Sequence, residues 1–177
     1  MPETNLYTTT IAPMIKGLTA LSSLINKAVD FAESKKLPWA SFESALLADH
    51  NVFDQFPLIK QIQVTCDNAK GAAARLAEVE NPKHDDNETT FAQLKERVAK
   101  TLAFVESIKP EQVNGKEGIT ITISYFPGKF MTGSEYAKEY AIPNFYFHLT
   151  TAYNLLRKNG MSIGKDDFLG GLPLKDI

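Results

Sequence analysis

The sequence predicts a mostly α-helical protein, a four-helix bundle with a small β-hairpin before the fourth helix. Apolar residues recur at steps of three and four over four long segments, which is the periodicity of amphipathic helices. Only one short segment alternates apolar and polar residues with a period of two, as a strand does. The length of 177 residues is typical of one domain, and we expect residues 1–177 to form a single helical bundle domain.

The first helix is predicted over about residues 7–34, and Pro38 follows its end. Its apolar stripe consists of Ile11, Met14, Leu18, Leu21, Ile25, Ala28 and Ala32. The connection over residues 38–56 is long and mostly irregular, with a short helical turn possible at 41–48. A connection of this length is typical of a chain that crosses a bundle, so the first two helices are expected to be parallel neighbours.

The second helix is predicted over residues 57–79, and the small residues at 69–74 would allow another helix to approach closely. That neighbour could come from the same bundle or from a partner chain, and we expect a homodimer. The third helix follows at about 90–108, where Thr90 and Gln93 form a capping box.

The strand-like segment covers residues 119–125, and Pro127 with Gly128 then provides a turn from which 129–131 could return. The fourth helix opens with a second capping box at Thr132 and Glu135 and ends before Gly160. Pro143 within this helix should kink it or delay its regular part.

The composition excludes several classes of function. The net charge is −2 and the pI is about 5.9, so the chain lacks the basic surface of a nucleic-acid-binding protein. A single cysteine, Cys66, excludes an internal disulfide and a cysteine-based zinc site, and it is expected in the core. Neither a signal peptide nor a transmembrane stretch is predicted, which indicates a cytoplasmic protein with no membrane partner. Motifs of nucleotide-binding loops and of common hydrolases are missing.

Several segments together resemble the DinB/YfiT-like superfamily of four-helix bundles, and more closely a family known only as a domain of unknown function. They are FPLIKQIQ at 56–63, CDNAKGAAARLA at 66–77, DNETTF at 86–91, PNFYFH at 143–148 and GKDDFLG at 164–170. Metal-binding relatives use one histidine from the second helix and an H-x-x-x-H pair on the fourth. Here His148 matches the second histidine of that pair, but Asn144 stands at the first.

The second helix contains no histidine, and Gln61, Gln63 or Asp67 lies in the corresponding region. Because a neutral amide is a poor ligand for zinc or nickel, no metal and no other cofactor is expected. The alternative is a zinc or nickel site in which unusual ligands surround His148.

A polar pocket is nevertheless predicted between the second and fourth helices. Gln63 and Asp67 lie one turn apart, as do Asn144 and His148, so each pair shares one helix face. We expect the two faces to meet in the bundle interior. The hydroxyl of Tyr140 or Tyr125 would complete the hydrogen-bond network.

Simpler explanations exist for these histidines. His148 could be a buried structural imidazole, and Asn144 could satisfy backbone groups that Pro143 leaves free. His50 and His84 are expected on the surface.

Two functions of different classes remain open. The first is a non-catalytic bundle that binds a small molecule, and the second is a metal-dependent enzyme similar to the thiol transferases of the superfamily. No catalytic residue is assigned in either case.

Overall fold

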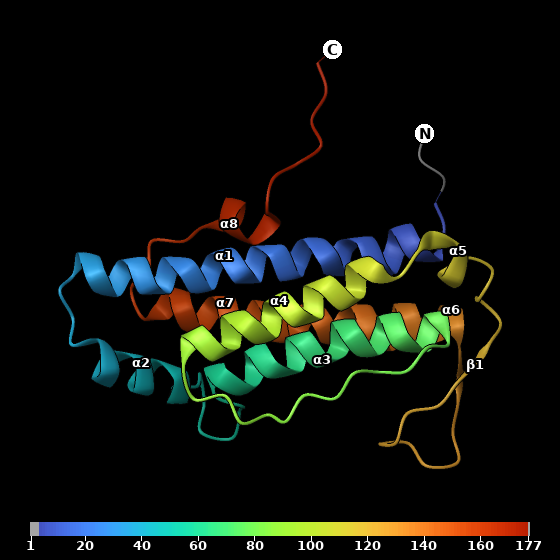
Figure 1. Cartoon of the computed structure of the whole chain (residues 1–177), viewed down its shortest axis with the longest axis horizontal. Coiled ribbons are helices and arrows are strands. Elements are labelled where there is room, and N and C mark those ends of the chain that lie inside the picture. The colour runs from blue at the N-terminus through green and yellow to red at the C-terminus, as the bar shows by residue number, and fades with distance from the viewer. Residues whose placement is uncertain (1–3, 177) are drawn as a thin grey trace.

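The computed structural model describes residues 4–176 and confirms the DinB-like helical bundle (Figure 1). Its long helices are α1 (Ala12–Ser34), α3 (Leu58–Ala77), α4 (Phe91–Ser107) and α7 (Ile142–Lys158). The shorter helices are α2 (Trp39–Ala48), α5 (Pro110–Val113), α6 (Gly133–Glu135) and α8 (Lys165–Leu169). No helix within residues 4–176 is long and apolar enough to cross a membrane.

The long helices run in two directions (Figure 1). Helices α1 and α7 are parallel, because Gly17 packs against Phe145 near their starts and Gly160 faces Phe31 near their ends. Helices α3 and α4 run the opposite way. The prediction that the first two helices are parallel neighbours is therefore wrong: α1 and α3 are antiparallel.

The reason lies in the two long connections. Ten residues of the first connection form α2, and the Leu58 amide donates to the Asp49 carbonyl at 2.9 Å, so this segment turns the chain at one end of the bundle. The second connection, residues 78–90, runs the length of the bundle and brings the chain back to start α4 (Figure 1). We call residues 78–90 the crossover.

Two π-helical turns precede the prolines of the long helices. They are η1 (Tyr7–Ile11), before Pro13, and η2 (Tyr136–Ala141), before Pro143. The amides of Ala12 and Ile142 bond to carbonyls five residues back, so each helix is widened where the proline ring would crowd the preceding turn. Pro143 thus lies in the first turn of α7, which delays the regular helix as the sequence predicts.

Both predicted capping boxes are present. The Thr90 hydroxyl accepts from the Gln93 amide at 3.3 Å, and the Thr132 hydroxyl accepts from the Glu135 amide at 3.3 Å. Each box satisfies amides that would otherwise lack a partner at the start of a helix.

The hairpin is shorter than the predicted strand at 119–125. Strand β1 (Thr120–Ile121) pairs with β2 (Met131–Thr132) in antiparallel register. The predicted alternation continues only as far as Ile123, which is buried with Ile121, whereas the Tyr125 side chain is 82% exposed. The chain turns there, and the Phe126 amide donates to the Ile123 carbonyl.

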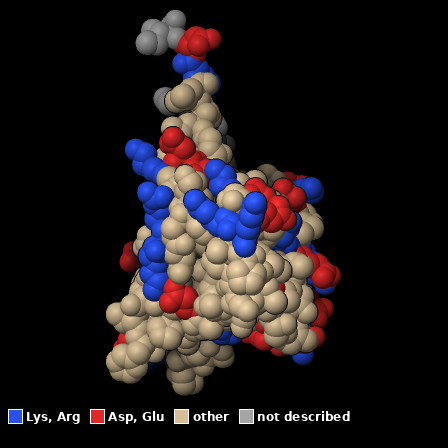
Figure 2. Space-filling model, turned by 90° about the vertical axis from the view of Figure 1, so that its left-hand side faces the viewer, with Lys and Arg blue, Asp and Glu red and all other residues tan. Residues whose placement is uncertain are grey.

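The small-residue face of α3 is used inside the bundle. Ala69, Ala72, Ala73 and Ala74 are all fully buried against neighbouring helices. The helix that approaches this face therefore belongs to the same bundle, so the face is not available to a partner chain. The homodimer stays a prediction, but the small residues of α3 no longer support it. The C-terminal segment after α8 extends away from the bundle (Figures 1 and 2).

Candidate functional site

A polar cavity of about 510 Å³ lies between α3 and α7, beside the crossover and the segment after β1. The polar residues of its wall are Lys60, Asp67, Asn68, Lys70, Arg75, Asn81, Asp86, Ser124, Tyr125, Tyr140, Asn144 and His148. Five of the six residues predicted from the sequence line this cavity. We call it the α3–α7 pocket.

A second cavity of about 630 Å³ lies at the α2 end of the bundle and is mainly apolar, with Leu37, Trp39 and Phe91 in its wall. Figure 2 looks onto this end of the molecule and shows charged side chains over the upper part of the face, with a mainly uncharged surface below them. Its carboxylate Glu43 already accepts from the Phe91 amide at 2.6 Å, capping α4. The α3–α7 pocket, with convergent polar groups, is therefore the candidate site.

Three polar pairs join α3 to the η2–α7 helix along the pocket. The Nδ1 atom of His148 lies 2.7 Å from Oε1 of Gln61, and the Asn144 Nδ2 donates to the Asn68 Oδ1 at 2.8 Å. The Arg75 Nη1 donates to the Tyr136 hydroxyl at 3.3 Å. The members on α3 are seven residues apart, so they follow one face of that helix. We call these six residues the polar seam.

The hydrogen bonds of Gln61 define the tautomer of His148. The Gln61 Nε2 donates to the Phe56 carbonyl at 2.9 Å, and a carbonyl can only accept. The Oε1 of Gln61 therefore faces His148, whose Nδ1 must carry the hydrogen. Burial also lowers the pKa of His148 below its ordinary value, so the ring is neutral near pH 7 and its Nε2 keeps a lone pair.

Gln63 was expected to approach His148, but in the structure Gln61 is the glutamine that does so. The Nε2 of Gln63 donates to Glu88 at 2.9 Å, on the side of α3 that faces α4. Two residues along a helix differ by about 200° around its axis, which explains why only one glutamine can face His148. Asp67 does line the pocket, but its Oδ1 accepts from Arg97 at 2.8 Å instead of meeting His148.

The two predicted tyrosines line the pocket without joining the hydrogen-bond network. Within the described part of the chain, neither hydroxyl of Tyr140 and Tyr125 has a hydrogen-bond partner, and Tyr125 lies exposed at the rim. Tyr140 stacks on Tyr136 with ring centroids 5.9 Å apart. It is Tyr136 whose hydroxyl bonds to the seam, and burial raises its pKa, which keeps that hydroxyl protonated.

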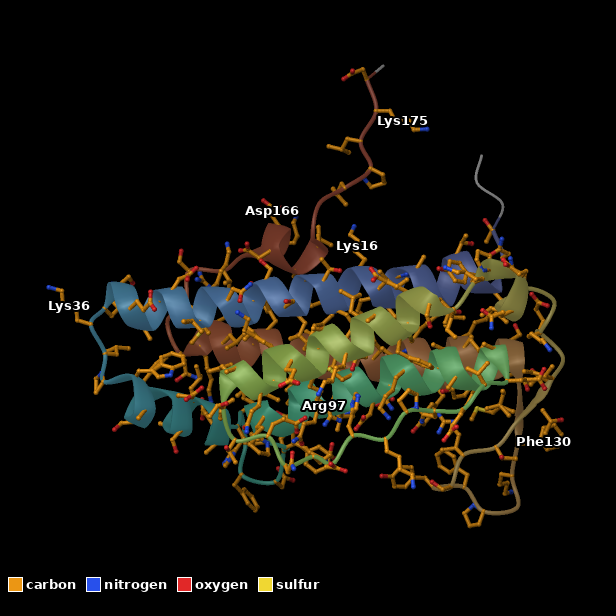
Figure 3. All side chains as sticks on the ribbon, in the orientation of Figure 1. Lys16, Lys36, Arg97, Phe130, Asp166 and Lys175 are labelled. Atoms are coloured by element: carbon orange, nitrogen blue, oxygen red, sulfur yellow. The ribbon has the colours of Figure 1, made fainter. Side chains whose placement is uncertain are left out.

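The buried guanidinium of Arg97, labelled in Figure 3, is the centre of a charged cluster that the sequence did not predict. It bonds to Asp67 at 2.8 Å, to Asp86 at 2.7 Å and to Glu88 at 3.0 Å. Burial alone would lower the pKa of Arg97, but the Glu88 hydrogen bond and the Asp67 charge raise it instead. Since Asp86 and Glu88 belong to the crossover, Arg97 ties that segment to α3 and α4.

His84, also on the crossover, is less exposed than expected. Its Nδ1 is buried without a hydrogen-bond partner among the described residues and lies 3.8 Å from Asp67. Burial lowers the pKa of His84, and the nearby positive charges of Arg97 and Lys70 lower it further. This imidazole is therefore neutral near pH 7.

The donor set of the pocket does not fit a transition metal. Within residues 4–176, no group of three His, Cys, Asp or Glu side chains is placed to hold an ion. The positions around His148 are amides that already bond to one another or to the imidazole. Cys66 is fully buried, and burial raises the pKa of its thiol to about 12, which removes it as a thiolate ligand.

Comparison with known families gives the assignment. The family described as "Domain of unknown function (DUF1993)" matches residues 6–169. The chain belongs to this family. The crystal structure of a DinB family member protein from Shewanella denitrificans is similar to this DUF1993 protein, with a TM-score of 0.89. The two sequences are 42% identical, and the match covers 97% of this chain and 96% of that chain. It thereby confirms the DinB-like assignment. No curated protein matches the chain.

Proposed function

We propose that this DUF1993 protein binds a small organic molecule in the α3–α7 pocket and does so without a transition metal. One observation carries the proposal: the Nδ2 of Asn68 is buried and has no hydrogen-bond partner among the described residues. A buried donor without a partner costs about 1–3 kcal/mol. Because Asn68 lines the pocket, a small shift of its side chain would bring Nδ2 to a ligand acceptor atom, and that hydrogen bond would offset the cost.

The neighbouring groups support a ligand with mixed hydrogen-bonding capacity. The Nδ1 of His148 is taken by Gln61, so Nε2 is the nitrogen left to accept from a ligand hydroxyl, amine or thiol. Tyr140 and Tyr125 add aromatic surface to the same pocket. A few convergent polar groups beside aromatic side chains are typical of small-molecule sites.

Elemental analysis of protein purified without a histidine tag tests the metal-free part of the proposal. We expect far less than one zinc or nickel per chain. The matched variants are His148→Ala and, as a control, His50→Ala, because His50 is exposed and its side chain forms no hydrogen bond in the described structure. Stoichiometric metal that is lost in His148→Ala but retained in His50→Ala would favour the metal-dependent enzyme instead.

An NMR screen with neutral fragments that carry both a donor and an acceptor tests the pocket itself. We expect the best fragments to shift the side-chain amide signals of Asn68 and Asn144, and to lose affinity in His148→Ala. If no fragment moves these signals at millimolar concentrations, the pocket is not a small-molecule site.

A further inference from the structure

The charges around the α3–α7 pocket balance, with one exception. The acidic groups Asp67, Asp86 and Glu88 all bond to Arg97. Lys60 lies 2.6 Å from Asp86, and Lys70 lies 3.3 Å from Asp67. Three carboxylates are thus matched by three cations.

Arg75 is the exception. Within residues 4–176 it forms no ion pair, although it lines the same pocket. Its guanidinium lies 5.8 Å from the centre of the Tyr136 ring and donates one hydrogen bond to that hydroxyl. A guanidinium has five N–H donors, so most of them remain available to a ligand.

A second donor lies beside this guanidinium, over Gly71. A Cβ atom at Gly71 would lie 2.5 Å from the Arg75 Nη1 and 3.9 Å from the Asn81 Nδ2, so the missing side chain lets the guanidinium lie against the Gly71 backbone, close to the Asn81 amide. The Asn81 Oδ1 accepts from Lys70 at 3.4 Å, which leaves its Nδ2 as the group free to donate. The Arg75 guanidinium and the Asn81 amide are therefore neighbouring nitrogen donors at this end of the pocket.

We infer that Arg75 and Asn81 bind the carboxylate of a small organic acid, an inference that rests on the proposed function and specifies its ligand. A planar carboxylate matches the fork of a guanidinium, and the pair forms strong charge-assisted hydrogen bonds. Arg75 lies in the last turn of α3, where the negative end of the helix dipole opposes a doubly charged phosphate more strongly than a singly charged carboxylate. The body of the acid lies along Tyr140 toward Asn68 and His148.

The test compares three probes of similar shape: benzoate, the neutral benzamide and the dianion phenylphosphonate. Binding is followed by NMR titration of the Asn68 and Asn144 side-chain amides at pH 8. We expect benzoate to bind about tenfold more tightly than benzamide, as charge-assisted hydrogen bonds imply, and more tightly than phenylphosphonate.

Variants at Arg75 test whether this residue causes the preference for benzoate over benzamide. Arg75→Gln should make benzoate and benzamide equivalent, and Arg75→Lys should keep only part of the preference because lysine lacks the fork. Gly71→Ala should reduce the preference by displacing the guanidinium. The control Lys16→Gln removes one exposed positive charge on the far side of α1 (Figure 3) and should leave the ratio unchanged.

The outcomes separate this inference from the proposed function. Equal binding of benzoate and benzamide to the parent protein, tightest binding of phenylphosphonate, or an unchanged ratio in a folded Arg75→Gln protein would each overturn the carboxylate site. Benzamide shifts at Asn68 and Asn144 would still support a small-molecule pocket in those cases. Absence of any benzoate shift at millimolar concentrations would also overturn the inference, while the neutral-fragment screen decides on the pocket independently.

Discussion

Replacing Arg97 by methionine should destabilise the protein strongly. Methionine has a similar length but cannot pair with Asp67, Asp86 and Glu88, and removing one partner of a buried ion pair costs about 3–5 kcal/mol. The Asp67 and Asp86 side chains are 35% and 36% exposed, so water and the nearby lysines compensate in part. We therefore expect the lower end, about 3 kcal/mol, or a fall in melting temperature of roughly 6–12 °C for a chain of this size.

Urea unfolding at pH 7 measures this effect, and Lys100→Met is the matched control. Lys100 is also on α4, but its ion pair with Glu96 is exposed and should contribute less than about 0.5 kcal/mol. Arg97 helps to hold the pKa values of Asp86 and Glu88 below their ordinary values, against the effect of burial. Stability from these carboxylates is fully present above pH 4 to 5 and is lost as the pH falls through their lowered folded-state pKa values, so the stability difference between the parent protein and Arg97→Met should narrow progressively below pH 4. Equal losses for Arg97→Met and Lys100→Met would refute this reasoning.

Three further predictions concern individual buried or half-buried residues. Gly133→Ala should prevent native packing, because its Cβ would lie 2.1 Å from the Lys116 carbonyl oxygen; thermal unfolding would show it. Cys66 should resist a thiol reagent in the native protein and react only in denaturant, since burial raises its pKa to about 12. The pKa values of His148 and His84 are lowered by burial, so the unfolded chain binds protons more tightly and stability should fall as pH drops from 7 to 5.5; a flat urea midpoint would contradict this.

The helices could be predicted because their signals are local. Apolar periodicity and the capping boxes at Thr90 and Thr132 depend on residues within a few turns of one another. The directions of the helices are not a local property. The length of the 38–56 connection suggested a chain that crosses the bundle, but its residues fold into α2, whereas the polar segment 78–90 forms the crossover.

The candidate site was predicted only in part for a similar reason. The prediction paired residues one turn apart, which correctly grouped Asn144 with His148 on one helix face but selected Gln63 on α3. The seven-residue spacing of Gln61, Asn68 and Arg75 was the available signal, because three polar residues at this spacing share a helix face. The pairing of Arg97 with the acidic crossover had no comparable signal, since it depends on how that segment packs across two helices.

The protonation of His148 tests most directly the claim that this pocket is organised by hydrogen bonds within the protein. A long-range ¹H–¹⁵N NMR spectrum at pH 7 reports which ring nitrogen carries the proton. The structure predicts a neutral ring with the proton on Nδ1, bonded to Gln61, and an unprotonated Nε2. A proton on Nε2, or a doubly protonated ring at pH 7, would contradict the account.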